Sequence, residues 1–70
     1  MTAFKPKEII KFLEKNWWVS DHITWSHCVM YNPETKKRTV VPIHRKDIPE
    51  WTLHAILRQT GFSKKDINKK

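Results

Sequence analysis

Residues 26–42 read SHCVMYNPETKKRTVVP, and this stretch decides the fold. Within it, Ser26–Tyr31 alternates in character, so that successive side chains are expected to face opposite sides of a strand. Asn32–Lys36 contains the residues typical of a turn, and Lys37–Pro42, with its β-branched residues, is expected to form a second strand. The stretch therefore predicts an antiparallel hairpin.

One further strand and two helices are expected around this hairpin. Trp17–Thr24 is rich in aromatic and β-branched residues, which suit a pleated surface. Pro6–Lys15 predicts a first helix, because proline is favoured at the first helical position. Glu50–Thr60 predicts a second helix, with Gly61 placed where a left-handed cap residue belongs. The apolar face of the first helix is expected to comprise Ile9, Ile10, Leu13 and Trp17.

The order of these elements indicates the fold class. Short connections between the strands predict a three-stranded antiparallel meander, with both helices on one face of the sheet. Ser63 and Asp66 resemble a capping box, which adds a short final turn. We therefore expect a single α+β domain over residues 1–70, in the order α-β-β-β-α. A chain of this length buries a small core, so any active site should be shallow and open.

Charge and cysteine content limit the function. The chain has 14 Lys and Arg against 7 Asp and Glu, a net charge of +7, which favours a polyanionic partner such as nucleic acid. With 1 cysteine it can form no internal disulfide. Met1–Lys11 lacks the apolar run of a signal peptide, and no stretch is long enough to span a bilayer. We expect a cytoplasmic protein without membrane contact.

Histidine is the side chain best suited to move protons near neutral pH. The sequence has four, His22, His27, His44 and His54. None of them stands in a spacing typical of metal ligands, so no metal or other cofactor is expected. We expect His44 to shape the loop after the third strand and His54 to face solvent or a partner. The role of His22 stays open, and His27 is either a surface histidine or a catalyst.

The chain resembles the HicA toxins, the ribonuclease partners of HicB antitoxins. The likeness includes Lys7–Val19, Ser26-His27, Tyr31–Thr35, Val41–His44, Lys46–Pro49 and Thr52–Gly61. It implies a double-stranded-RNA-binding-domain-like fold, metal-independent cleavage of mRNA as an endoribonuclease, and inhibition by a HicB-type antitoxin. It also implies a catalytic histidine in a Gly-Ser-His motif. Ser26-His27 matches the last two residues of that motif, so the resemblance assigns catalysis to His27.

The sequence departs from the family pattern at three tryptophans. Trp17, Trp25 and Trp51 stand where the family usually has glycine. If those glycines adopt positive φ, a tryptophan there would cost of order 1 kcal/mol or more at each position. We expect Trp25 and Trp51 either to stack unpaired bases or to form an apolar patch that an antitoxin covers. Trp18, in contrast, is expected in the core.

In the implied reaction His27 acts as a general base on a ribose 2′-hydroxyl, which then attacks the adjacent phosphorus. The residues expected to bind RNA are Trp25, Ser26, Lys36, Lys37 and Arg38. The last three are expected to offset charge on the phosphorane. No DNA contact is expected. Two alternatives stay open: a non-catalytic double-stranded-RNA-type binding module, and a protein-interaction element whose basic surface meets an acidic partner.

Overall fold

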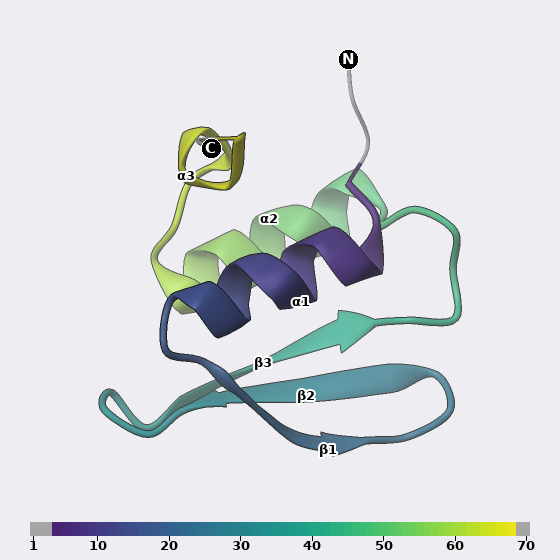
Figure 1. Ribbon diagram of the computed structural model, residues 1–70. Helices are drawn as coiled ribbons and strands as arrows, with labels where there is room; N and C mark the ends of the chain where they lie inside the picture. Colours follow the sequence, from purple (N-terminus) through teal and green to yellow (C-terminus); the bar gives the residue numbers. More distant parts are fainter. Residues whose placement is uncertain (1–3, 69–70) are drawn as a thin grey trace.

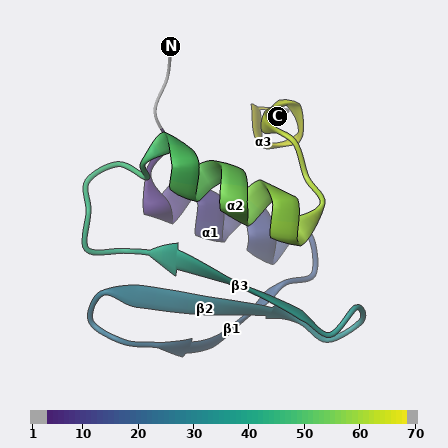
Figure 2. The same ribbon diagram turned by 180° about the vertical axis from the view of Figure 1, so that it is seen from behind.

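The computed structural model describes residues 4–68 and has two layers, with helices lying over one face of a sheet (Figure 1). Its elements are α1 (Pro6–Lys15), β1 (Val19–Ile23), β2 (His27–Asn32), β3 (Lys37–Pro42), α2 (Glu50–Thr60) and α3 (Lys64–Asn68). The strands form an antiparallel sheet in the order β1-β2-β3. In both views α1 and α2 lie on the same side of this sheet (Figure 2). The predicted α-β-β-β-α fold is confirmed.

The hairpin of β2 and β3 supplies the sheet side of the core. In β2, Cys28 and Met30 are buried, whereas the residues between them are exposed or half-buried, as the alternation predicts. In β3, Thr39 and Val41 are buried in the same way. The buried apolar residues are Phe4, Ile9, Leu13, Trp18, Cys28, Met30, Val41, Ile48, Leu53 and Ile56. Both helices thus pack against the face of the hairpin that contains Cys28, Met30 and Val41.

The first strand is shorter than predicted. β1 covers Val19–Ile23 instead of Trp17–Thr24, and all five of its residues are exposed. It is an edge strand, and its register to β2 shifts between Ser20 and His22, which is a β-bulge. Trp17 and Trp18, the aromatic residues that suggest a longer strand, lie instead in the turn before β1.

That turn ends α1 and separates the two adjacent tryptophans. The sequence pattern places Trp17 on the apolar face of the first helix, and this prediction is wrong: Trp17 is 78% exposed, whereas Trp18 is 3% exposed. Trp17 has a left-handed φ of 74°, and the backbone N–H of Trp18 donates to the carbonyl of Leu13 at 3.0 Å. This is a Schellman cap. The left-handed residue reverses the chain, so only the residue after it enters the core.

We predict that Trp17→Gly stabilises the protein by about 1 kcal/mol, because glycine adopts a left-handed conformation without a steric penalty. The indole of Trp17 is exposed, so its removal loses little packing. For a domain of this size the melting temperature should rise by about 4–8 °C. Thermal unfolding followed by circular dichroism measures it. Trp25→Gly is the matched control, since Trp25 is equally exposed but has no positive φ, and a comparable rise in that variant would contradict the prediction.

The second half of the chain follows the sequence prediction closely. Gly61 has a φ of 84° and closes α2 with a hydrogen bond from its N–H to the carbonyl of Leu57. The backbone N–H of Ser63 donates to the carboxylate of Asp66 at 2.9 Å, which caps α3 as expected. Within residues 4–68, the helices are all too short or too polar to cross a membrane.

Candidate active site

His27 stands at the start of β2 in a tightly bonded turn. The backbone N–H of Thr24 donates to the carbonyl of His27 at 2.8 Å. The Thr24 hydroxyl oxygen also accepts the backbone N–H of His27 at 3.1 Å. The same hydroxyl donates to the carbonyl of His27 at 3.3 Å, because a threonine hydroxyl can both donate and accept. Thr24, which the sequence did not indicate as a functional residue, therefore hydrogen-bonds both backbone groups of His27.

The side chain of His27 is oriented by its neighbour Ser26. Ser26 Oγ lies 2.8 Å from His27 Nδ1, a hydrogen bond at short range. The hydrogen bond at one ring nitrogen determines which proton the other carries. When Nδ1–H donates to Ser26 Oγ, Nε2 carries the free lone pair. The predicted Ser-His pair is thus a physical pair, and it leaves Nε2 as the nitrogen that can face a substrate.

His27 opens onto a hollow of about 360 Å³, which we call the His27 hollow. It is lined by His27, Val40, Pro42, Arg45, Pro49, Trp51, Thr52 and Ala55. His27 and Pro42 are paired across the hairpin, and α2 supplies the opposite wall. A proton-transfer group and a permanent cation therefore share one open, mostly apolar hollow.

Arg45 is the functional candidate that the sequence analysis missed. It lies in the loop between β3 and α2 and is exposed. Arg45 and Lys46 are adjacent cations in that loop, but adjacency in sequence does not reveal which site a loop side chain reaches. That it lines the same hollow as His27 depends on how α2 packs over β3.

The basic residues predicted to act beside the phosphorane lie at the other end of the hairpin. The register pairs His27 with Pro42 but Asn32 with Lys37. Five residues of strand separate the two ends, a length of about 17 Å. Lys36 and Lys37 are exposed beside the β2–β3 turn. Lys36 and Lys37 therefore lie at the end of the hairpin opposite to His27, and the role predicted for them in RNA binding stays a prediction.

Arg38 contacts two residues on the face of the sheet that is turned away from the helices. Its guanidinium donates to the Asp21 carboxylate at 3.1 Å and lies 4.7 Å from the centre of the Tyr31 ring. This hydrogen bond from Arg38, followed by the one from His22, lowers the pKa of Asp21. The charge of Arg38 is thus partly compensated, and Arg38 also lies outside the His27 hollow.

The three tryptophans at family glycine positions have different roles. Among residues 4–68, positive φ at a non-glycine residue occurs at Trp17 and Lys36, so Trp25 and Trp51 carry no left-handed strain. Trp51 is 77% exposed and lines the His27 hollow. Trp25 is 78% exposed but turns its ring edge-on to His44, with 4.6 Å between ring centres. Trp25 therefore leaves the His27 hollow open.

The other histidines are each engaged outside the hollow. His22 contacts Asp21 at 3.3 Å, and the exposed His54 contacts Glu50 at 3.2 Å. The pKa of Glu50 is lowered by Lys64, which contacts its carboxylate, and then by His54. Within residues 4–68, no three His, Cys, Asp or Glu side chains gather closely enough to hold a metal ion. Of the four histidines, His27 is the one that lines the His27 hollow.

A known protein family matches most of the chain. The family model described as "HicA toxin of bacterial toxin-antitoxin" matches residues 6–62. The matched region begins with α1 and ends just after Gly61, so it includes every residue that lines the His27 hollow. No curated protein matches the chain.

Proposed function

This chain belongs to the HicA toxin family, and from that premise we propose that it is a metal-independent endoribonuclease that cleaves mRNA. His27 is its catalytic residue and a HicB-type antitoxin its inhibitor. The observation that carries the proposal is the shared hollow: His27, oriented by Ser26, lines it together with Arg45. Because its substrate is mRNA, the toxin acts in the cytoplasm.

In the proposed reaction, Nε2 of His27 takes the proton of a ribose 2′-hydroxyl. The 2′-oxygen then bonds to the adjacent phosphorus, and the bond from phosphorus to the 5′-oxygen breaks. The leaving 5′-oxygen takes a proton from water, so the products carry a 2′,3′-cyclic phosphate and a 5′-hydroxyl. A positioned general base contributes about 10²–10⁴-fold to such a step.

The other residues of the His27 hollow support the same reaction. Arg45 supplies a permanent positive charge beside the phosphorane, where negative charge increases in the transition state. Trp51 offers an exposed aromatic face, and base stacking on such a face contributes about 1–3 kcal/mol per base. Trp51 also belongs to the apolar surface that a HicB-type antitoxin would cover to block the hollow.

A metal-free cleavage assay tests the proposal. The purified protein is incubated with a labelled single-stranded RNA in excess EDTA, and the ends of the fragments are identified. We expect cleavage that leaves a cyclic phosphate. The alternative, a non-catalytic binding module, predicts tight binding with intact RNA. The position of Trp25 favours cleavage, since its indole packs on His44 and does not line the hollow.

We predict that Ser26→Ala lowers kcat about 2- to 10-fold, the worth of one hydrogen bond of about 0.5–1.5 kcal/mol, and leaves KM nearly unchanged. Ser26 is a positioning residue, because it acts through the tautomer of His27. Steady-state kinetics on a short RNA measure both constants. Ser26→Thr keeps the hydroxyl and should restore kcat; an equal loss in that variant, or a change confined to KM, would reject this role.

A further inference from the structure

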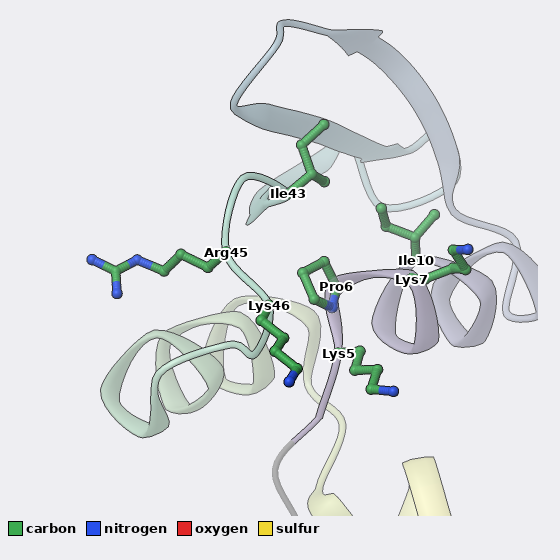
Figure 3. A pocket seen from close by; sticks show the side chains of 7 residues that line it. All are labelled: Lys5, Pro6, Lys7, Ile10, Ile43, Arg45 and Lys46. Carbon is green, nitrogen blue, oxygen red and sulfur yellow. The ribbon is translucent and has the colours of Figure 1, made fainter.

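A second hollow, of about 350 Å³, lies between the start of α1 and the loop after β3. It is lined by Lys5, Pro6, Lys7, Ile10, Ile43, Arg45 and Lys46, and we call it the lysine hollow (Figure 3). Four of these side chains are cationic and none is acidic. Glu8, the first acid on α1, accepts a hydrogen bond from the backbone of Lys5 at 2.8 Å. The rim is therefore strongly positive, whereas Pro6, Ile10 and Ile43 provide apolar surface.

The two hollows share Arg45. This residue lines both of them, and its side chain extends over α2, away from Pro6 and Ile10 (Figure 3). The His27 hollow and the lysine hollow are thus neighbours along one surface, with Arg45 at their boundary.

The loop that joins the hollows is attached at both ends. The backbone N–H of Ile43 donates to the carbonyl of Ser26 at 2.9 Å, next to His27. The backbone N–H of Ile48 donates to the carbonyl of Phe4 at 2.8 Å, next to Lys5. Ile48 and Phe4 are both buried, so this second attachment is part of the core. The position of the lysine hollow relative to His27 is therefore set by backbone hydrogen bonds.

We propose that the lysine hollow binds the backbone of single-stranded RNA next to the cleaved bond, with Arg45 contacting the phosphate between the two hollows. This inference rests on the proposed function, because it extends the same substrate. Lysines around one hollow repel each other unless an anion joins them, and phosphates release counterions when they bind such a cluster. The half-buried side chains of Ile10 and Ile43 offer apolar surface for the base faces of unpaired nucleotides, which a duplex keeps stacked inside.

A binding experiment tests the lysine hollow without requiring cleavage. The probe is a fluorescein-labelled single-stranded RNA of about twelve nucleotides with 2′-O-methyl riboses, which cannot be cut at a 2′-hydroxyl. Its affinity is measured by anisotropy between about 50 and 200 mM salt. The double variant Lys5→Gln/Lys7→Gln removes two cations of the hollow. Lys15→Gln/Lys65→Gln is the matched control, because these exposed lysines line neither hollow.

We expect Lys5→Gln/Lys7→Gln to weaken binding about tenfold at low salt and to reduce the salt slope by about 1.4, which is about 0.7 for each lost phosphate contact. The control should bind like the unchanged protein, and circular dichroism verifies that both variants fold. Equal losses in the two double variants would mean that only overall charge matters, which would overturn the inference. Unchanged affinity and slope in Lys5→Gln/Lys7→Gln would also overturn it.

Cleavage assays separate this inference from the proposed function. If the proposed function and the inference about the lysine hollow are both correct, the loss of kcat/KM in Lys5→Gln/Lys7→Gln grows with RNA length. A dinucleotide at His27 is too short to reach far into the lysine hollow. If the protein cleaves no RNA but its salt slope falls in this variant alone, the proposed function fails and the lysine hollow is supported.

Discussion

His27→Ala is expected to lower RNA cleavage by about 10²–10⁴-fold, because it removes the group proposed to accept the proton of the 2′-hydroxyl. RNA binding should change only a few-fold, since Arg45 and the lysines of the lysine hollow supply the positive charge that attracts phosphates. Single-turnover cleavage and anisotropy measure the two effects separately. In cells, induced expression of the variant should no longer arrest growth.

His54→Ala is the matched control for this change. His54 is likewise an exposed histidine, but it contacts Glu50 on α2 and lines neither hollow. It should cleave RNA like the unchanged protein. Growth arrest as strong with His27→Ala as with the unchanged protein would remove His27 from the catalytic role. An equal loss in both histidine variants would point to a general effect on folding or charge.

Arg45→Gln is expected to lower kcat by about 10²-fold, which is the lower end of the effect of removing one donor from a preorganised anion site. The lower end applies because Arg45 is exposed and solvent screens its charge. KM should also rise, since Arg45 meets a phosphate before the reaction begins. Arg45→Lys should recover part of kcat, because lysine keeps the charge but lacks the planar fork of donors. Steady-state kinetics on a short RNA measure these effects.

Arg58→Gln controls for the loss of one positive charge. Arg58 is an exposed arginine on α2 that lines neither hollow. We expect its kcat to match the unchanged protein. If Arg45→Gln were as active as Arg58→Gln, the charge beside the phosphorane would have to come from another residue, and the proposed mechanism would lose its cation.

Local patterns predicted most of the fold because the forces behind them are local. The alternation in β2 predicted that Cys28 and Met30 share one face of the strand, and turn chemistry placed the end of α2 at Gly61. Each of these depends on residues within one element or one turn. The prediction for Trp17 was wrong because the spacing of apolar residues does not show where a helix ends, and Trp17 lies just beyond the end of α1 in a left-handed conformation. No glycine marks the left-handed residue that ends α1, so the one signal for that cap was the resemblance, which has a glycine where this chain has Trp17.

The candidate site likewise has one part that a local motif indicated and one part that depends on tertiary packing. Ser26 and His27 are adjacent in the chain, so a motif was enough to predict that they act together. The cation was predicted from the cluster at Lys36, Lys37 and Arg38, which the strand register places at the far end of the hairpin from His27. Arg45, 18 positions after His27, lines the His27 hollow because the loop folds back between the turn at Ser26 and the start of α1.

The sequence by itself therefore determined a basic α-β-β-β-α domain and the Ser26-His27 pair, because periodicity and adjacency act over a few residues. Only the tertiary structure decided which cation joins His27, which tryptophan enters the core and where the lysine hollow lies. Each of these depends on the packing of α2 and the loop against the sheet. Such packing brings together residues far apart in the chain, and its energy is shared among many side chains, so no single stretch of sequence encodes it.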